Sequence, residues 1–314
     1  MISGMLSLSR RRFLQQAGLA ASGAAIASGL PSRSWAASVG RVPGIQLYMV
    51  NDDLTKDPAG TLAKIAAAGY KEVESAGFAN LTAAQFRKLV DDAGLHCPSA
   101  HLYFGMQETG KLLEDANALG VQYVVSSILP PHPPATNDIA GIMQLMNNLT
   151  LDDFKHMAEL ANQIGGQAKK AGLQYAYHNH NIEFRDYGGQ TGYDILLKET
   201  DPNLVKFEAD CGWMVTAGVN PVDFLHRYPG RYRMIHVKDF TASTKTSTTL
   251  SLGDGQAATE LGRGHIDYKP ILAAAKKAGV EHYFIEQDPP ILGMTPLEAA
   301  KIDCDSLRKL WAAG

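Results

Sequence analysis

The sequence predicts a single α/β domain folded as a (β/α)8 barrel. From residue 44 onward, short apolar runs of strand length alternate with amphipathic segments of helix length. Eight such alternations fill the rest of the 314-residue chain, which is long enough for one barrel of this kind. The competing fold is a doubly wound open sheet, which usually binds its ligand at one Gly-rich loop. No GxGxxG pattern follows any of the runs, so we favour the barrel.

The predicted strands and helices follow each other in a regular order. The strands cover 45–48, 70–74, 96–101, 123–127, 174–180, 205–210, 234–238 and 282–287. The helical segments between and after them include 58–68, 82–93, 113–119, 151–171, 221–226, 268–278 and 297–311. Thr82, Asp267 and Thr295 stand at the starts of three helices and predict N-caps. Ala-Gly pairs at 68–69, 93–94, 171–172 and 278–279 mark helix ends that turn into the next strand.

The first 36 residues do not follow this alternation. Ser9-Arg10-Arg11-Arg12-Phe13-Leu14 precedes a weakly apolar Ala/Gly stretch, and Ser34-Trp35-Ala36 is a small-x-small cleavage pattern. We interpret residues 1–36 as a twin-arginine signal peptide and residues 37–314 as the mature barrel. The twin-arginine export machinery is then an expected partner, and the expected location is periplasmic or otherwise exported. The alternative is a basic N-terminal helix.

Composition excludes several classes of protein. The chain is 45% hydrophobic and 19% charged, which is typical of a soluble globular fold. A net charge of −3 with no basic face makes nucleic acid a poor candidate partner. The sequence contains no run of 18 or more strongly apolar residues, so we expect no membrane span in the mature protein. The three cysteines are an odd number without CxxC spacing, so neither a disulfide framework nor a zinc-thiolate site is expected.

Two long loops interrupt the regular pattern. Pro130-Pro131-His132-Pro133-Pro134 leads the loop after the fourth strand, and residues 241–264 after the seventh strand are rich in Ser, Thr and Gly. Both loops leave the carboxyl ends of strands, where barrel enzymes build their active sites. We therefore expect functional residues at this end of the barrel.

Acidic and imidazole side chains gather at four successive strand ends. Glu183, Asp210, His236 and Glu286 follow or end strands five to eight, so they are neighbours around one half of the barrel mouth. Burying so many polar groups is costly unless they bind something. Carboxylate and imidazole ligands suit Mn²⁺, Mg²⁺, Co²⁺ or a catalytic Zn²⁺. The sequence therefore predicts a divalent metal site.

The ligand from strand five is less sharply defined. His178 and His180 lie two apart on the strand and share one face, while Glu183 follows in the exit loop. We favour Glu183 as the ligand, with His180 close by for substrate binding or proton transfer. The reverse assignment, with a histidine as the ligand, stays open.

Other polar and aromatic residues reach the same mouth. Glu74 and His101 end the second and third strands, across the mouth from the metal ligands. Lys238 shares the face of His236 and is a further candidate for acid/base or substrate contact. The remaining candidate substrate contacts are His178, Trp213 and His265, while Tyr48 and Phe78 with Trp213 could form an apolar wall for a sugar.

These motifs resemble the xylose-isomerase-like sugar phosphate isomerase/epimerase barrels. The resemblance spans about residues 44 to 312 and rests on Gly69-Tyr70-Lys71-Glu72-Val73-Glu74, Ser99-Ala100-His101, Tyr177-His178-Asn179-His180-Asn181-Ile182-Glu183-Phe184, Glu208-Ala209-Asp210-Cys211-Gly212-Trp213, Ile235-His236-Val237-Lys238-Asp239, Gly262-Arg263-Gly264-His265-Ile266-Asp267 and Ile285-Glu286-Gln287. It implies a Glu-Asp-His-Glu metal site and chemistry next to a sugar carbonyl, with His180, Glu286, Glu183 and Lys238 as candidate catalytic groups.

One departure narrows the expected substrate. Epimerases of this family often carry the first metal Glu about where Ala176 stands. The Tyr-His-Asn-His pattern together with an export signal looks more like the branch that acts on 3-keto-glycosides. The resemblance implies a metal-stabilised enediolate, from which epimerisation, isomerisation, or lyase or hydrolase cleavage can follow. The alternatives are a non-catalytic exported sugar-binding protein and, less favoured, a phosphodiesterase, for which the basic groove is not visible.

Overall fold

The computed structural model describes residues 42–132, 139–242, 245–250, 257–289, 291 and 293–313. Eight parallel strands close into a barrel in the order β1-β10-β7-β6-β5-β4-β3-β2, which confirms the predicted fold. These strands are β1 (Pro43–Gln46), β2 (Glu72–Ser75), β3 (His96–His101), β4 (Tyr123–Ser126), β5 (Gln174–His178), β6 (Val205–Asp210), β7 (Tyr232–Val237) and β10 (His282–Ile285). The leader assigned to residues 1–36 lies outside the described residues.

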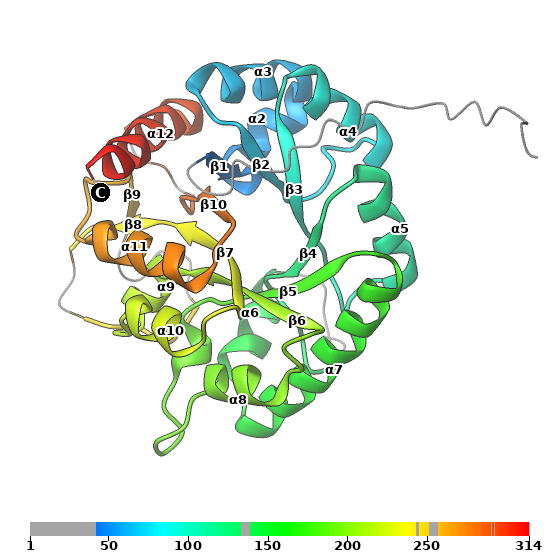
Figure 1. Ribbon diagram of the computed structural model, residues 1–314, viewed down its shortest axis with the longest axis vertical. Coiled ribbons are helices and arrows are strands. Elements are labelled where there is room, and N and C mark those ends of the chain that lie inside the picture. Colours follow the sequence, from blue (N-terminus) through cyan, green and yellow to red (C-terminus); the bar gives the residue numbers. More distant parts are fainter. Residues whose placement is uncertain are drawn as a thin grey trace, which may run out of the picture. The chain divides into compact units, whose positions relative to one another are not determined.

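Helices form a ring outside the strands (Figure 1). They are α2 (Asn51–Lys56), α3 (Pro58–Ala68), α4 (Ala83–Asp92), α5 (Thr109–Leu119), α6 (Ile139–Asn147), α7 (Leu151–Lys170), α8 (Gly192–Glu199), α9 (Cys211–Thr216), α10 (Pro221–Arg227), α11 (Tyr268–Ala278) and α12 (Pro296–Ala312), with 3-10 turns η1 (Leu47–Val50) and η2 (Ile182–Phe184). No helix among the described residues is both long and apolar enough to cross a membrane.

Local sequence signals set the helix boundaries. Thr82, Thr150, Thr191 and Thr295 each form a capping box, in which the threonine and the third helical residue bond each other's backbone N–H groups. Gly69 ends α3 with φ of 110°, a left-handed conformation that favours glycine. These signals begin or end each helix at the point where the chain passes between a helix and the neighbouring strand or loop.

An apolar layer inside the barrel separates its two ends. Tyr123, Val125, Ala176, Met234 and Phe284 form a buried cluster of their own. Ala176 and Phe284 precede His178 and Glu286 by two residues, so each polar residue stands one inward position higher toward the carboxyl ends of the strands. The apolar layer is therefore the floor below a polar cluster at the barrel mouth.

The long loop after β7 carries structure of its own. β8 (Asp239–Phe240) and β9 (Ala258–Thr259) pair in an antiparallel two-stranded sheet. Residues 245–250 of the same loop are tied to the segment that follows β5, because Asn181 donates to the carbonyl oxygens of Ser247 and Thr249. Residues 133–138, 243–244 and 251–256 of the two predicted long loops lie outside the described residues.

Candidate metal centre

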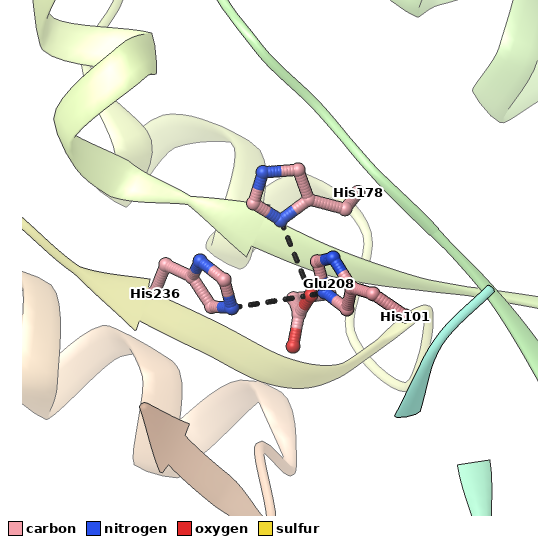
Figure 2. A group of neighbouring side chains, drawn as sticks. All are labelled: His101, His178, Glu208 and His236. Carbon is pink, nitrogen blue, oxygen red and sulfur yellow. Dashed lines mark hydrogen bonds and ion pairs between the residues drawn. The ribbon is translucent and has the colours of Figure 1, made fainter. Parts of the chain in front are cut away.

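Three histidines surround one buried carboxylate at the barrel mouth. His101, His178 and His236 come from β3, β5 and β7, and Figure 2 shows their rings pointing toward Glu208 of β6. The Glu208 Oε2 lies 2.8 Å from His101 Nε2, 3.1 Å from His178 Nδ1 and 3.3 Å from His236 Nε2. These four residues form one group able to hold a metal ion.

A second group uses the opposite sides of two of these rings. His178, Asp210, His236 and Glu286 also offer ligand atoms that lie within 4.8 Å of one another. Asp210 Oδ2 lies 3.9 Å from both His178 Nε2 and His236 Nδ1, and Glu286 Oε2 lies 3.0 Å from His236 Nδ1. The second group contains three of the four predicted ligands, with His178 in the place given to Glu183.

The two groups exclude each other chemically. They share His178 and His236, and a neutral imidazole binds a metal through one nitrogen while the other carries a proton. Filling both groups at once would require two imidazole rings stripped of both protons. In the second group the free N–H of His178 faces Glu208, and that of His236 faces Glu74 Oε2 at 2.7 Å. Metal-binding histidines usually donate to such carboxylates, so the second group is the better metal site.

Two buried carboxylate oxygens in the cluster are suited to bind a cation. Glu208 Oε1 and Asp210 Oδ2 are buried and lack a hydrogen-bond partner. The ammonium of Lys238 forms ion pairs with Asp210 Oδ2 at 3.2 Å and with Glu286 Oε2 at 2.7 Å. It makes no hydrogen bond to Asp210 Oδ2. Buried carboxylate oxygens are costly unless a cation or donor faces them. The His/Glu/Asp cluster is thus consistent with a divalent metal site.

Charge in the cluster is distributed unevenly among the rings. Burial favours a neutral His236, but the charges of Glu208 and Glu286 raise its pKa well above the ordinary value. Burial likewise opposes charge on His101, but Glu74 and Glu208 raise its pKa to about 10. Burial and the charge of His236 lower the pKa of His178. In the metal-free protein, protonated rings therefore balance part of the carboxylate charge.

His180 and Glu183 lie beside the cluster and in neither metal-binding group. Glu183 accepts hydrogen bonds from the Tyr177 hydroxyl at 2.8 Å and from the His180 backbone N–H at 2.9 Å. Burial raises its pKa to about 7, although these donors oppose the rise. The His180 ring centroid lies 5.1 Å from that of His178, and its Nδ1 has no hydrogen-bond partner. Burial, then His178 and Lys238, lower the pKa of His180 well below its ordinary value, so the ring is neutral.

The other predicted residues divide between the cluster and its surroundings. Glu74 lies in the cluster, where its Oε2 contacts His236 and lies 3.1 Å from His101 Nε2. Trp213 lies under the Lys238 ammonium, 5.0 Å from ring centroid to Nζ. His265 bonds the Phe240 carbonyl oxygen and lines a separate pocket of about 390 Å³ beside α10 and α11.

Sequence reasoning assigned no role to Glu208, Gln46 or Ser99. Gln46 and Ser99 both donate to the Glu74 carboxylate, at 2.9 and 2.5 Å. Glu208 stands two residues before Asp210 on the same strand, so the alternation of side chains along β6 carried a signal for it. Gln46 and Ser99 are neutral residues within apolar runs and gave no comparable signal.

Comparison with known proteins places the chain in one family of barrels. A family described as xylose isomerase-like TIM barrel matches residues 62–310. An inosose dehydratase from Lacticaseibacillus casei is 33% identical over 153 residues, which cover 45% of this chain and 50% of the relative. The chain thus spans about half the length of the curated relatives that it matches.

Solved structures share the barrel over most of its length. A sugar phosphate isomerase/epimerase from Parabacteroides distasonis ATCC 8503 is 26% identical, with a TM-score of 0.66, and covers 87% of this chain and 95% of its own. The IOLI protein, solved with a bound zinc atom, has a TM-score of 0.60 at 14% identity and covers 87% of this chain and 99% of its own. The latter likeness concerns the fold alone.

Proposed function

The chain belongs to the xylose isomerase-like TIM barrel family of sugar isomerases, epimerases and dehydratases, and we propose that it is a divalent-metal-dependent enzyme that cleaves 3-keto-glycosides by elimination. The single observation that carries this proposal is the group of His178, Asp210, His236 and Glu286 at the barrel mouth. These four residues would hold a divalent ion, which would supply Lewis-acid stabilisation for negative charge developing on a carbonyl oxygen.

His180 is the proposed base that removes the proton next to the carbonyl. The ring is neutral because its pKa is lowered, so one nitrogen has a free lone pair. Its Nδ1 is buried without a hydrogen-bond partner, and the ring lies 6.0 Å from Trp213 between centroids. A sugar ring bound at the cluster would bring its C–H group to this side. Glu286 is less suitable as a base, because Lys238 and His236 already hold its carboxylate.

Lys238 is the proposed source of fixed positive charge beside the reacting oxygens. Burial opposes its charge, but Asp210, Asp288 and Glu286 raise its pKa well above the ordinary value. The ammonium therefore stays protonated and holds Glu286 and Asp288, each at 2.7 Å. Its role is to orient these carboxylates and to hydrogen-bond a sugar hydroxyl or carbonyl.

Elimination is favoured over epimerisation by the relatives and by the leaving-group chemistry. An inosose dehydratase, as its name says, removes water from a keto-cyclitol, and the present chain is 33% identical to one over 153 residues. In a 3-keto-glycoside the C2 proton goes to His180, and the electron pair of that C–H bond forms the C1–C2 double bond. The glycosidic C1–O bond breaks, and the leaving oxygen takes a proton from the protonated base or water.

Turnover of matched glycosides tests this proposal. Metal-loaded mature protein should cleave methyl 3-keto-β-glucoside, whereas methyl β-glucoside, with a hydroxyl at C3, should remain intact because its C2 proton is not acidic. His180→Ala should lower cleavage about 100-fold or more, the scale of lost general-base catalysis. Products are read by NMR. Equal cleavage of both glycosides would indicate ordinary hydrolysis, and binding without turnover would indicate a sugar-binding protein.

A further inference from the structure

Two tyrosines at the barrel mouth are exposed although large aromatic side chains elsewhere are covered. Tyr48 is 48% exposed and Tyr103 is 54% exposed, and they are the exposed large hydrophobic side chains among the described residues. Exposed aromatic rings with a polar tip are common where a protein contacts a ligand that is partly apolar. Their position relative to the metal centre shows what they can contact.

Each tyrosine lies two residues after the end of a strand whose last residue contacts the polar cluster. Tyr48 follows Gln46, the last residue of β1, and Tyr103 follows His101, the last residue of β3. The strand between them in the barrel is β2, which carries Glu74. Tyr48 and Tyr103 therefore flank one side of the mouth, on the outer side of the polar cluster.

Backbone hydrogen bonds hold both residues in place. The Tyr48 N–H donates to Gln46 Oε1 at 3.0 Å, and Gln46 Nε2 donates to Glu74 Oε2 at 2.9 Å. The Tyr103 carbonyl oxygen accepts from the N–H groups of Met106 and Gln107, which closes a turn after β3. The exposed rings are thus mounted on fixed backbone, which limits the entropy lost when a ligand binds.

The Tyr48 phenol lies within electrostatic reach of Tyr103 and of two carboxylates at the centre. Partial burial raises the pKa of the Tyr48 phenol, and the charges of Asp288 and Glu286 and the phenol of Tyr103 add to the rise. Glu286 belongs to the metal-binding group, and Asp288 pairs with Lys238. The Tyr48 ring is therefore half exposed at the end of β1 and within electrostatic reach of the metal-binding group.

We propose that Tyr48 and Tyr103 form an outer subsite that binds the leaving group of a glycoside, with a ring-shaped aglycone or second sugar packed on the tyrosine rings. This rests on the proposed function, which places the keto-sugar ring at the metal centre. A free monosaccharide at that centre would leave both tyrosines in water. A glycoside extends outward from C1 and would cover them with the apolar face of its second ring.

A kinetic comparison of two leaving groups tests the subsite. The measured quantity is the ratio of kcat/KM for phenyl 3-keto-β-glucoside to that for methyl 3-keto-β-glucoside. Tyr48→Ala and Tyr103→Ala should each lower this ratio roughly threefold to tenfold, the scale of one aromatic contact. Tyr48→Phe and Tyr103→Phe keep the rings and are the matched controls, so they should keep the ratio. An unchanged ratio in both alanine variants would overturn the proposal.

A binding measurement separates this proposal from failure of the proposed reaction. If the wild-type protein cleaves neither keto-glycoside, saturation-transfer NMR with phenyl β-glucoside and metal-loaded protein decides the subsite alone. The phenyl protons should receive saturation from the wild-type protein and lose most of it with the Tyr48→Ala/Tyr103→Ala protein. Equal saturation in the two proteins would overturn the subsite. A change of molar mass in the double variant, with the ratio unchanged, would instead assign the tyrosines to an interface between two copies.

Discussion

His178 and Glu183 offer alternative ways to complete the metal site from strand five. Glu183 has both oxygens bonded to other donors, the Tyr177 hydroxyl of β5 and the His180 backbone N–H, whereas His178 faces Asp210 with a free nitrogen. His178→Ala should therefore lower metal affinity by more than about 100-fold, beyond the effect of losing an outer partner. Glu183→Gln should keep the metal. Metal content after dialysis, read by mass spectrometry, checks both, and loss of metal from Glu183→Gln alone would reverse the assignment.

Metal binding should displace a proton from His236. The pKa of this ring is raised above its ordinary value, so the metal-free protein keeps the ring protonated at pH 7. A metal needs the neutral nitrogen, so binding should release about one proton, and affinity should rise with pH until the pKa of His236 is passed. Calorimetry in two buffers of different ionisation enthalpy measures the release. Identical heats in both buffers would mean that no proton leaves.

At the scale of single residues, the sequence predicted the kinds of side chain in the cluster better than it predicted which of them face one another. Asp210, His236 and Glu286 were recognised because they stand at strand ends, and the structure brings them together. Glu183 was favoured by its charge, but chain geometry turns it toward Tyr177 and the His180 backbone, and a loop conformation of this kind cannot be read from spacing. Ala176 lies in the apolar floor, where a carboxylate would need a partner among Val125, Met234 and Phe284.

At the scale of elements, the strands and most helices followed their predicted ranges. α3 and α11 begin and end where expected, because an Asp N-cap precedes each helix and an Ala-Gly pair ends it. α2, α6, α8 and α9 were not among the predicted helices; α9 has only six residues and follows directly on β6, with Asp210 as its N-cap. Gly212 in α9 lets the helix approach β7, since a Cβ there would lie 2.7 Å from the Lys238 carbonyl oxygen. Such close packing depends on two segments that are distant in sequence.

Helix α12 carries a buried carboxylate that should make stability depend on pH. Asp303 accepts the Leu261 N–H at 2.6 Å, and its Oδ2 has no hydrogen-bond partner. Burial raises its pKa to about 7, although the Leu261 N–H opposes the rise. The folded protein then binds more protons than the unfolded chain between about pH 4 and pH 7, so stability falls as pH rises through that window.

Asp303→Asn removes this penalty while keeping an oxygen for the Leu261 N–H. The variant should gain stability relative to the wild type as pH rises from 4 to 7, by no more than about 4 kcal/mol. Denaturant unfolding at several pH values measures the difference. Asp305→Asn is the matched control, because Asp305 lies on the same helix with an exposed ion pair to Lys301. A gain that does not change with pH would contradict the burial of a charge at residue 303.

At the scale of the whole molecule, the barrel explains why the site exists. The carboxyl ends of the parallel strands lie at one mouth, so residues on β3, β5, β6 and β7 meet Glu286, which directly follows β10, although they are far apart in sequence. The alternation of strands and helices was enough to predict this architecture. It could not predict the two exclusive metal-binding groups, since they depend on which nitrogen of each ring faces which carboxylate.

Export of the whole chain remains a prediction from its first 36 residues. The Arg10-Arg11 pair followed by an Ala/Gly stretch is typical of a twin-arginine signal. Replacing both arginines by lysine should leave the full-length precursor in the cytoplasm, whereas the unchanged chain should appear shortened in the periplasm. Fractionation followed by mass spectrometry checks both the location and cleavage after Ala36. Normal export of the lysine variant would count against this route.

The most direct measurement is the position of a bound metal in the mature protein. Crystals grown with Mn²⁺ and measured near the manganese absorption edge should show one anomalous peak. We expect it within coordination distance of His178, Asp210, His236 and Glu286, with Glu208 and Glu74 hydrogen-bonded to the two rings. A peak bound by Glu183, a peak among His101, Glu208 and the opposite ring nitrogens, or no peak at all would contradict the assigned centre.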